Sequence, residues 1–135
     1  MLAIRTVHGA FRIGCNFRIP LKPKTPCVVD DKPLAEWQVC GAVSFQSAGS
    51  QLVLEQLGLY GWNKPVWDVC AGFGGKTVAL LERGIAVPLA SDRSRQRLAG
   101  LPGQCDRLAL PQPSTLLVDA AHPPLTEWRG HMLVD

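Results

Sequence analysis

Short apolar runs of strand length alternate with helical segments over the second half of the chain. The runs cover residues 66–70, 85–90, 114–118 and 130–134. The helical segments cover residues 77–83 and 93–101, and Pro102 predicts a kink before a continuation over residues 104–110. Strands and helices that alternate at such short separations form right-handed βαβ units and a parallel sheet. The sequence therefore predicts an α/β fold.

Length and composition place this pattern in a globular protein. The chain has 135 residues, enough for one domain with its own core, and 47% of them are hydrophobic. It has no apolar run of about 18 residues that would cross a membrane, and its start lacks the apolar centre of a secretory signal. Five cysteines without a C-x-x-C spacing argue against a disulfide framework or a zinc site. We therefore expect reduced thiols, a cytoplasmic location, no metal and no membrane partner.

Residues 1–45 form a basic, proline-rich segment that precedes the alternating pattern. Before the first acid the segment carries only basic charges, at Arg5, Arg12, Arg18, Lys22 and Lys24. Such a segment can neutralise nucleic-acid phosphates, but on this feature alone an ordinary solvated surface or a poorly ordered terminus is the favoured interpretation. Four prolines in residues 20–33 predict an extended connector, and residues 34–43 a short helix after it.

Residues 46–135 form the second predicted unit. It opens with a helix over residues 51–59, which either Ser47 or Ser50 would cap. Apolar residues at helical spacing predict the buried face of this helix, namely Leu52, Val53, Leu57 and, less clearly, Leu54.

Each of the four predicted strands carries an acid near its carboxyl end. Asp68 lies within the first strand, and the others close with Asp92, Asp119 and Asp135. In an open parallel sheet, ligands bind outside the carboxyl ends of the strands. An aspartate at a strand end can also simply form a turn or cap a helix. We favour ligand binding, because all four acids accompany a Gly-rich turn.

The Gly-rich turn follows the first strand and leads into a helix. Its residues are Cys70, Ala71, Gly72, Phe73, Gly74, Gly75, Lys76 and Thr77. Glycines let the backbone pass close to a ligand and turn into a helix whose first N–H groups are free. The turn is a near miss to two phosphate-binding motifs, since a Walker loop needs glycine where Cys70 stands and the dinucleotide fingerprint needs one at Thr77.

A nucleoside cofactor without a pyrophosphate fits this spacing best. Its amino-acid end would lie against the turn, and its ribose hydroxyls would bind Asp92, which follows Gly75 by 17 positions. S-adenosylmethionine is such a cofactor. Nucleotide binding through the Gly-Gly-Lys-Thr run is the weaker alternative. The nearby Arg93, Arg95 and Arg97 predict a solvated face, with phosphate contact as a second possibility.

The run VWDVCAGFGGKT resembles the motif D-x-C-A-x-P-G-G-K-T of the Fmu/Sun-type (NOL/NOP/Sun) RNA (cytosine-5) methyltransferases, of the bacterial ribosomal-RNA type. Four further segments resemble the family's Q-D-x-x-S helix start, its second and third motifs, and the beginning of its D-A-P-C-S motif. They are residues 46–50, 92–98, 116–120 and 131–135. The resemblance covers about residues 34–135. It implies a Rossmann-like S-adenosylmethionine-dependent methyltransferase fold, truncated here after its fourth strand.

The resemblance also implies a role for each matching residue. The methionine part of S-adenosylmethionine would be wrapped by Cys70, Ala71, Gly72, Phe73, Gly74, Gly75 and Lys76. Asp92 would bind the ribose, Asp119 would lie on the adenine side, and Asp135 would lie beside the transferable methyl group and the target base. The RNA partner would be ribosomal. The open edge of the truncated sheet would also favour self-association.

Two departures from the family bear on activity. Phe73 replaces the proline of the first motif, so the turn loses a fixed φ angle. The family's two cysteines, one of which attacks carbon 6 of cytosine, have no counterpart among these residues. We therefore expect this chain alone to be inactive, with no catalytic residue of its own. The alternative function is a non-catalytic S-adenosylmethionine- or RNA-binding module, or a degenerate remnant.

Overall fold

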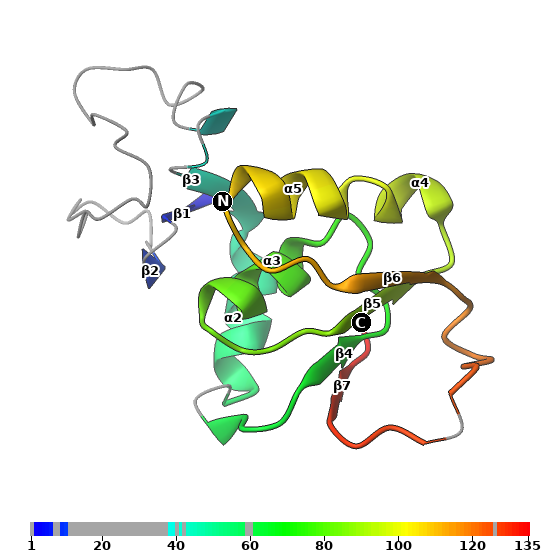
Figure 1. Cartoon of the computed structure of the whole chain (residues 1–135). Coiled ribbons are helices and arrows are strands. Elements are labelled where there is room, and N and C mark those ends of the chain that lie inside the picture. Colours follow the sequence, from blue (N-terminus) through cyan, green and yellow to red (C-terminus); the bar gives the residue numbers. More distant parts are fainter. Residues whose placement is uncertain are drawn as a thin grey trace, which may run out of the picture.

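The computed structural model describes residues 2–6, 9–10, 38–39, 41, 43–58, 61–125 and 127–135. Within these ranges the strands form two sheets (Figure 1). The larger sheet has four parallel strands, in the spatial order β6 (Ser114–Leu117), β5 (Leu89–Asp92), β4 (Val66–Asp68) and β7 (His131–Leu133). The predicted α/β class is confirmed, and a parallel sheet in this order is compatible with a Rossmann-like fold.

Helices connect the strands of this sheet as the alternating pattern predicts. Helix α3 (Gly75–Glu82) joins β4 to β5. Helices α4 (Arg95–Leu98) and α5 (Leu101–Arg107) join β5 to β6. The connection from β6 to β7 runs through a long loop, drawn in orange in Figure 1. The carboxyl ends of the parallel strands therefore lie at one edge, as a ligand site of this fold class requires.

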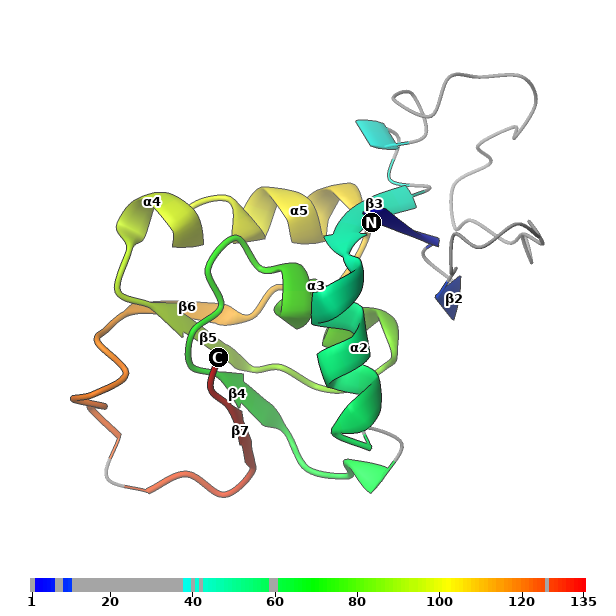
Figure 2. The ribbon, with the colours of Figure 1, turned by 180° about the vertical axis from the view of Figure 1, so that it is seen from behind.

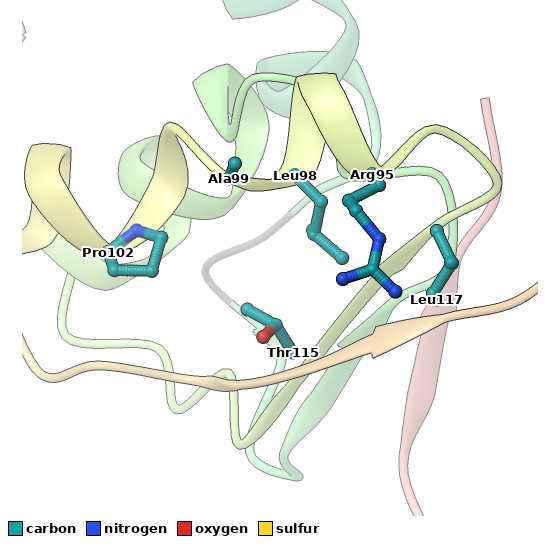
Figure 3. Close-up of a pocket in the computed structure, with 6 residues that line it drawn as sticks. All are labelled: Arg95, Leu98, Ala99, Pro102, Thr115 and Leu117. Carbon is teal, nitrogen blue, oxygen red and sulfur yellow. The ribbon is translucent and has the colours of Figure 1, made fainter.

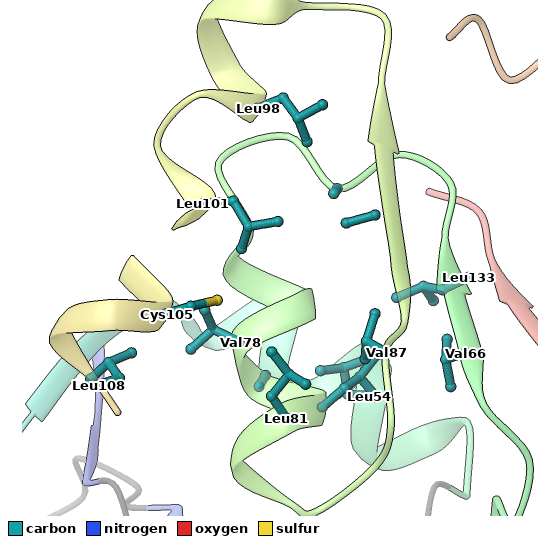
Figure 4. Close-up of a cluster of buried hydrophobic side chains, with 14 residues drawn as sticks. Leu54, Val66, Val78, Leu81, Val87, Leu98, Leu101, Cys105, Leu108 and Leu133 are labelled. Carbon is teal, nitrogen blue, oxygen red and sulfur yellow. The ribbon is translucent and has the colours of Figure 1, made fainter. Parts of the chain in front are cut away.

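The core lies between the sheet and these helices. Its buried apolar side chains come from helices, strands and the residues beside them, as Figure 4 shows for Leu54, Val66, Val78, Leu81, Val87, Leu98, Leu101, Cys105, Leu108 and Leu133. Successive side chains of a strand point to opposite faces. Val66 therefore packs towards the helices, whereas Trp67 points to the other face of the sheet.

The buried Trp67 side chain lies on the second face of the sheet. Its indole Nε1 donates a hydrogen bond to Ser91 Oγ at 2.9 Å, and Ser91 Oγ donates to Val69 O at 2.9 Å. The Trp67 ring also meets Trp128 edge to face, with 5.9 Å between the ring centroids. The two hydrogen bonds join the region of β4 to β5, and the ring contact joins β4 to the loop before β7.

The helical region after β5 departs from its predicted form. Instead of one kinked helix, α4 ends at Leu98 and α5 begins at Leu101. Pro102 lies in the first turn of α5. A helix leaves its first N–H groups unpaired, so a proline there costs no hydrogen bond, whereas in the middle of a longer helix it would. The proline therefore marks a helix start and not a kink.

The smaller sheet also departs from prediction. It is antiparallel, with β1 (Leu2–Thr6) between β2 (Gly9–Ala10) and β3 (Val43–Ser47). Strand β3 overlaps the end of the helix expected over residues 34–43. It also crosses the predicted boundary between the unit of residues 1–45 and the unit of residues 46–135. The buried side chains of β3 include the polar Ser44 and Gln46. A buried polar face is not the pattern by which a half-buried strand is predicted.

Helix α2 (Ala48–Gln56) begins three residues before the predicted start. Its buried apolar residue is Leu54, whereas Leu52, Val53 and Leu57 are exposed. The predicted buried face is therefore wrong in three of its members. Apolar residues occur on several sides of this helix, so the pattern could not tell which side meets α3.

Several expectations fall on residues outside the described ranges. They concern the connector over residues 20–33 and the basic side chains of Arg12, Arg18, Lys22 and Lys24. Most of the helix expected over residues 34–43 falls there as well, although Gln38 and Val39 are described and helical. Within the described ranges, no helix has the length and apolar character needed to cross a membrane.

Candidate functional site

The Gly-rich turn lies at the carboxyl edge of the parallel sheet, close to the C-terminus (Figure 2). Backbone hydrogen bonds fix its start to the strands on both sides. Val69 N donates to Leu133 O at 2.9 Å, and Ala71 N donates to Ser91 O at 2.8 Å. The turn therefore begins as a continuation of β4 between β5 and β7.

Two glycines in the left-handed conformation shape the turn. Their φ angles are 56° at Gly72 and 84° at Gly74, values that residues with a Cβ rarely adopt. Gly74 N donates to Ala71 O at 2.8 Å, and α3 begins immediately afterwards. A Cβ at Gly74 would lie 2.4 Å from Leu101 Cδ1, so this backbone packs directly on α5. The tight entry into a helix that the glycines predict is confirmed.

Phe73, between these glycines, points its ring outward. The residue is 63% exposed, and its carbonyl accepts a hydrogen bond from Gln104 Nε2 at 2.7 Å. This bond ties the outer part of the turn to α5. It supplies a restraint at the position where the family motif has a proline. Nothing in the sequence pattern pointed to Gln104.

The carboxylate of Asp92 holds the turn from the end of β5. Its Oδ2 accepts from Gly72 N at 2.8 Å, and its Oδ1 accepts from Ser94 N at 2.7 Å. Asp92 is buried. A carboxylate has about four acceptor sites, so these bonds leave capacity for a ligand hydroxyl. Asp92 thus organises both the turn and the start of α4.

Asp68 lies beneath the turn and binds the first turn of α3. Its Oδ2 accepts a hydrogen bond from Thr77 Oγ1 at 2.6 Å, and both residues are buried. Burial raises the pKa of Asp68 from 3.8 to about 6, against the hydrogen bond from Thr77 and the charge of Lys76, which lower it. Asp68 and Thr77 thus join the two ends of the turn.

Lys76 and Asp135 form an ion pair between α3 and the residues after β7. The lysine side chain is 18% exposed and the aspartate side chain 54%. Such a half-exposed pair adds little to stability. It does bring Asp135 to Lys76 at the end of the Gly-rich turn. That Asp135 lies beside the transferable methyl group stays a prediction.

Asp119 and Cys70 are two further residues that the sequence predicts for the site. Asp119 is exposed after β6, and its Oδ1 accepts from Ala121 N at 3.0 Å, which is a turn contact. The alternative that such an acid forms a turn therefore describes Asp119 well. Cys70 is a half-buried free thiol at the start of the Gly-rich turn. In the described ranges no group of three or more His, Cys, Asp and Glu side chains is placed to hold a metal ion.

Gln46 supports the turn from β3. Its Nε2 donates to Gly75 O at 2.9 Å. The Oε1 atom of the same amide is buried without a hydrogen-bond partner in the described part of the chain. Gln46 lies in the segment that resembles the family's helix start, but the resemblance implies no role for it at the site. The alternation of residues 43–47 would point Gln46 outward, so the sequence carried no signal for this contact.

No protein-family model matches this chain, and no curated protein sequence matches it either. The resemblance to the RNA (cytosine-5) methyltransferases therefore stays a prediction. What the structure supplies is the α/β fold and the arrangement of the turn with Asp68, Asp92 and Asp135.

The left-handed glycine gives a first prediction about the turn. Replacing Gly74 with alanine should lower the free energy of unfolding by about 1–3 kcal/mol, because the φ angle is strained and Leu101 must move. Urea denaturation measures this loss. Gly75→Ala is the matched control, since a Cβ there meets nothing within 4 Å. Equal stabilities of the two variants would contradict the packing of Gly74 on α5.

The buried Asp68 gives a prediction about pH. Between about pH 4 and pH 6 the folded chain keeps a proton on Asp68 that the unfolded chain releases, so stability falls as the pH rises. The shift of the pKa from 3.8 to about 6 corresponds to a loss of about 3 kcal/mol. Asp68→Asn should remove this loss when urea denaturation is repeated across the range.

The control for this pH experiment is Asp106→Asn, at an exposed acid of α5. It removes one carboxylate in α5 and leaves the bond between Asp68 and Thr77 in place, so a change of profile seen in both variants would not be due to Asp68. A pH profile of Asp68→Asn that runs parallel to the unchanged chain between pH 4 and pH 6.5 would show that Asp68 does not titrate as its burial requires.

Proposed function

We propose that this chain binds S-adenosylmethionine at the carboxyl ends of β4, β5 and β6, as the cofactor-binding part of an RNA (cytosine-5) methyltransferase that acts on ribosomal RNA. The bond from Gly72 N to Asp92 Oδ2, at 2.8 Å, is the observation on which this rests. It joins the first glycine of the turn to the acid at the end of the next strand. A nucleoside cofactor with an amino-acid end needs these two elements side by side.

The turn and α3 would receive the amino-acid end of the cofactor. α3 has eight residues, and a helix of this kind leaves its first N–H groups without intrahelical partners. Those groups and the helix dipole attract a carboxylate. Gly72 carries no side chain on the side that faces Asp92, where a Cβ would lie 3.9 Å from Asp92 Oδ2. Lys76 offsets one of the two acids Asp68 and Asp135, and the negative charge that remains near the turn favours a cationic sulfonium over a neutral thioether.

Asp92 would receive the ribose. Its two hydrogen bonds to backbone N–H groups orient the carboxylate, and its remaining acceptor sites suit vicinal hydroxyls. Asp119 follows the neighbouring strand, where the adenine would lie. The exposed ring of Phe73 would lie beside the cofactor, at the place where the family motif has a smaller residue.

The reaction of the family needs a cysteine that adds to the cytosine ring, and no residue of this chain matches it. We therefore propose that these residues hold the cofactor but do not transfer its methyl group unaided. A non-catalytic binding module is the second candidate, and the same missing cysteine favours it. Nucleotide binding through the Gly-Gly-Lys-Thr run is less favoured, because Lys76 is already paired with Asp135.

Association of two copies through β7 belongs to the same proposal. In the described part of the chain β7 pairs only with β4, and Met132 and Val134 beside its open edge are exposed. An unprotected apolar strand edge favours pairing with a second chain.

Titration calorimetry with S-adenosylhomocysteine tests cofactor binding. We expect micromolar affinity for the unchanged chain and a loss of about tenfold or more in Asp92→Asn, because a charge-assisted hydrogen bond is lost. Asp106→Asn is the matched control and should bind like the unchanged chain. Absence of binding to the unchanged chain would contradict the proposal, and ATP binding lost in Lys76→Ala would favour the phosphate-loop alternative.

A second ligand separates recognition of the ribose from support of the turn. The 2′,3′-dideoxy analogue of S-adenosylhomocysteine should bind the unchanged chain more weakly than the parent compound. In Asp92→Asn the two compounds should bind almost equally, because the partner of the hydroxyls is gone. If both proteins preferred the parent compound to the dideoxy analogue by the same factor, the ribose hydroxyls would bind to a residue other than Asp92.

Transfer of a tritiated methyl group tests the missing cysteine. The chain is incubated with labelled S-adenosylmethionine and unmethylated ribosomal RNA, and label in the RNA is counted. We expect none above a blank without protein, because no residue of this chain can activate the cytosine ring. Label in 5-methylcytosine would show that another residue, such as Cys70, supplies the nucleophile.

A further inference from the structure

A hollow lies between α4 and β6, apart from the Gly-rich turn. Its volume is about 310 Å³, and it is lined by Arg95, Leu98, Ala99, Pro102, Thr115 and Leu117 (Figure 3). The lining includes none of the residues assigned to the cofactor. Its walls are mainly apolar, and the side chain of Arg95 extends from α4 towards Leu117 of β6.

The backbone of β6 is open along this groove. In the described part of the chain β6 pairs only with β5. Ser114 N donates to Pro88 O at 2.9 Å and Val118 N donates to Asp92 O at 3.1 Å, so these residues face β5. Backbone groups of successive strand residues point to opposite sides. The N–H and C=O groups of Thr115 and Leu117 therefore point away from the sheet.

Thr115 and Leu117 thus contribute twice to this region. Their side chains line the groove, and their backbone groups form the open edge beside it. An extended chain laid along β6 could bond to those groups and place every second side chain against the groove. Natural sheets protect such edges with charges, prolines or bulges, and residues 114–118 contain no charged residue and no proline.

Charge identifies the kind of chain that fits. Arg95 lines the groove, and Arg93 and Arg97 are exposed nearby. A second copy of this chain paired edge to edge at β6 would bring two Arg95 side chains towards each other, which charge repulsion disfavours. An acidic side chain would instead form a charge-assisted hydrogen bond with Arg95.

We propose that the groove binds an extended, acidic peptide segment of another protein. The segment adds to β6 as a further strand. An acidic side chain pairs with Arg95, and an apolar side chain two residues away rests on Leu98 and Pro102. This binding is independent of the cofactor, because the groove and the Gly-rich turn share no residue.

Fluorescence anisotropy with a labelled peptide of sequence Thr-Val-Thr-Glu-Thr tests the pairing with Arg95. Binding to the full chain should weaken about tenfold or more in Arg95→Glu. A peptide with lysine in place of its glutamate should recover affinity for that variant. Arg97→Glu is the matched control, because it makes the same charge change on α4 outside the groove. Failure of the peptide to bind, or an equal loss in both variants, would overturn the proposal.

Two further peptides test the added strand itself, each methylated on alternate backbone nitrogens. One set of N–H groups faces β6 and the other faces solvent, so one peptide should lose binding and the other keep it. Equal binding of both would mean attraction to a basic patch without strand pairing. Competition by a single-stranded RNA that depends on Arg95 and not on Arg97 would overturn the proposal in favour of a nucleic-acid site.

Discussion

The hydrogen bonds of one buried carboxylate organise the candidate site. Asp92 accepts from Gly72 N at 2.8 Å and from Ser94 N at 2.7 Å, so it joins the turn after β4 to the start of α4. A buried carboxylate is costly unless its oxygens have partners. The left-handed glycine and the short α4 supply them. The same hydrogen bonds that offset the cost of burying Asp92 also orient its carboxylate towards the strand ends, where a ligand would bind.

Asp68 is a second buried carboxylate of the site. Its pKa is raised to about 6, because the effect of burial outweighs the lowering by the hydrogen bond from Thr77 and the charge of Lys76. At neutral pH its ionised form therefore lowers stability. The hydrogen bond from Thr77 Oγ1 to Asp68 holds the first turn of α3 against the end of β4. A buried carboxylate with a raised pKa beside a Gly-rich turn is an arrangement typical of functional sites.

The parallel sheet and the turn could be predicted from the sequence because each has a local signal. Short apolar runs with an aspartate inside or just after them marked the four strands, although the run over residues 85–90 overlaps β5 only at its last two residues. Glycines marked the turn. The antiparallel sheet could not be predicted, since β3 buries Ser44 and Gln46 and pairs with β1, more than 35 residues away in sequence. The bond from Gln104 to Phe73, across 31 positions, is equally a product of tertiary packing. Asp119 matched the strand-end pattern, yet within the described residues its side chain forms only a local turn contact.

The most direct test of the account observes the turn while a ligand binds. Backbone amide signals of the full chain are followed by NMR during titration with S-adenosylhomocysteine. We predict that the amides of Gly72, Gly74 and Ser94 shift together and saturate at one ligand per chain. Binding that leaves these three signals unchanged while others move would contradict a cofactor site built on the turn and Asp92.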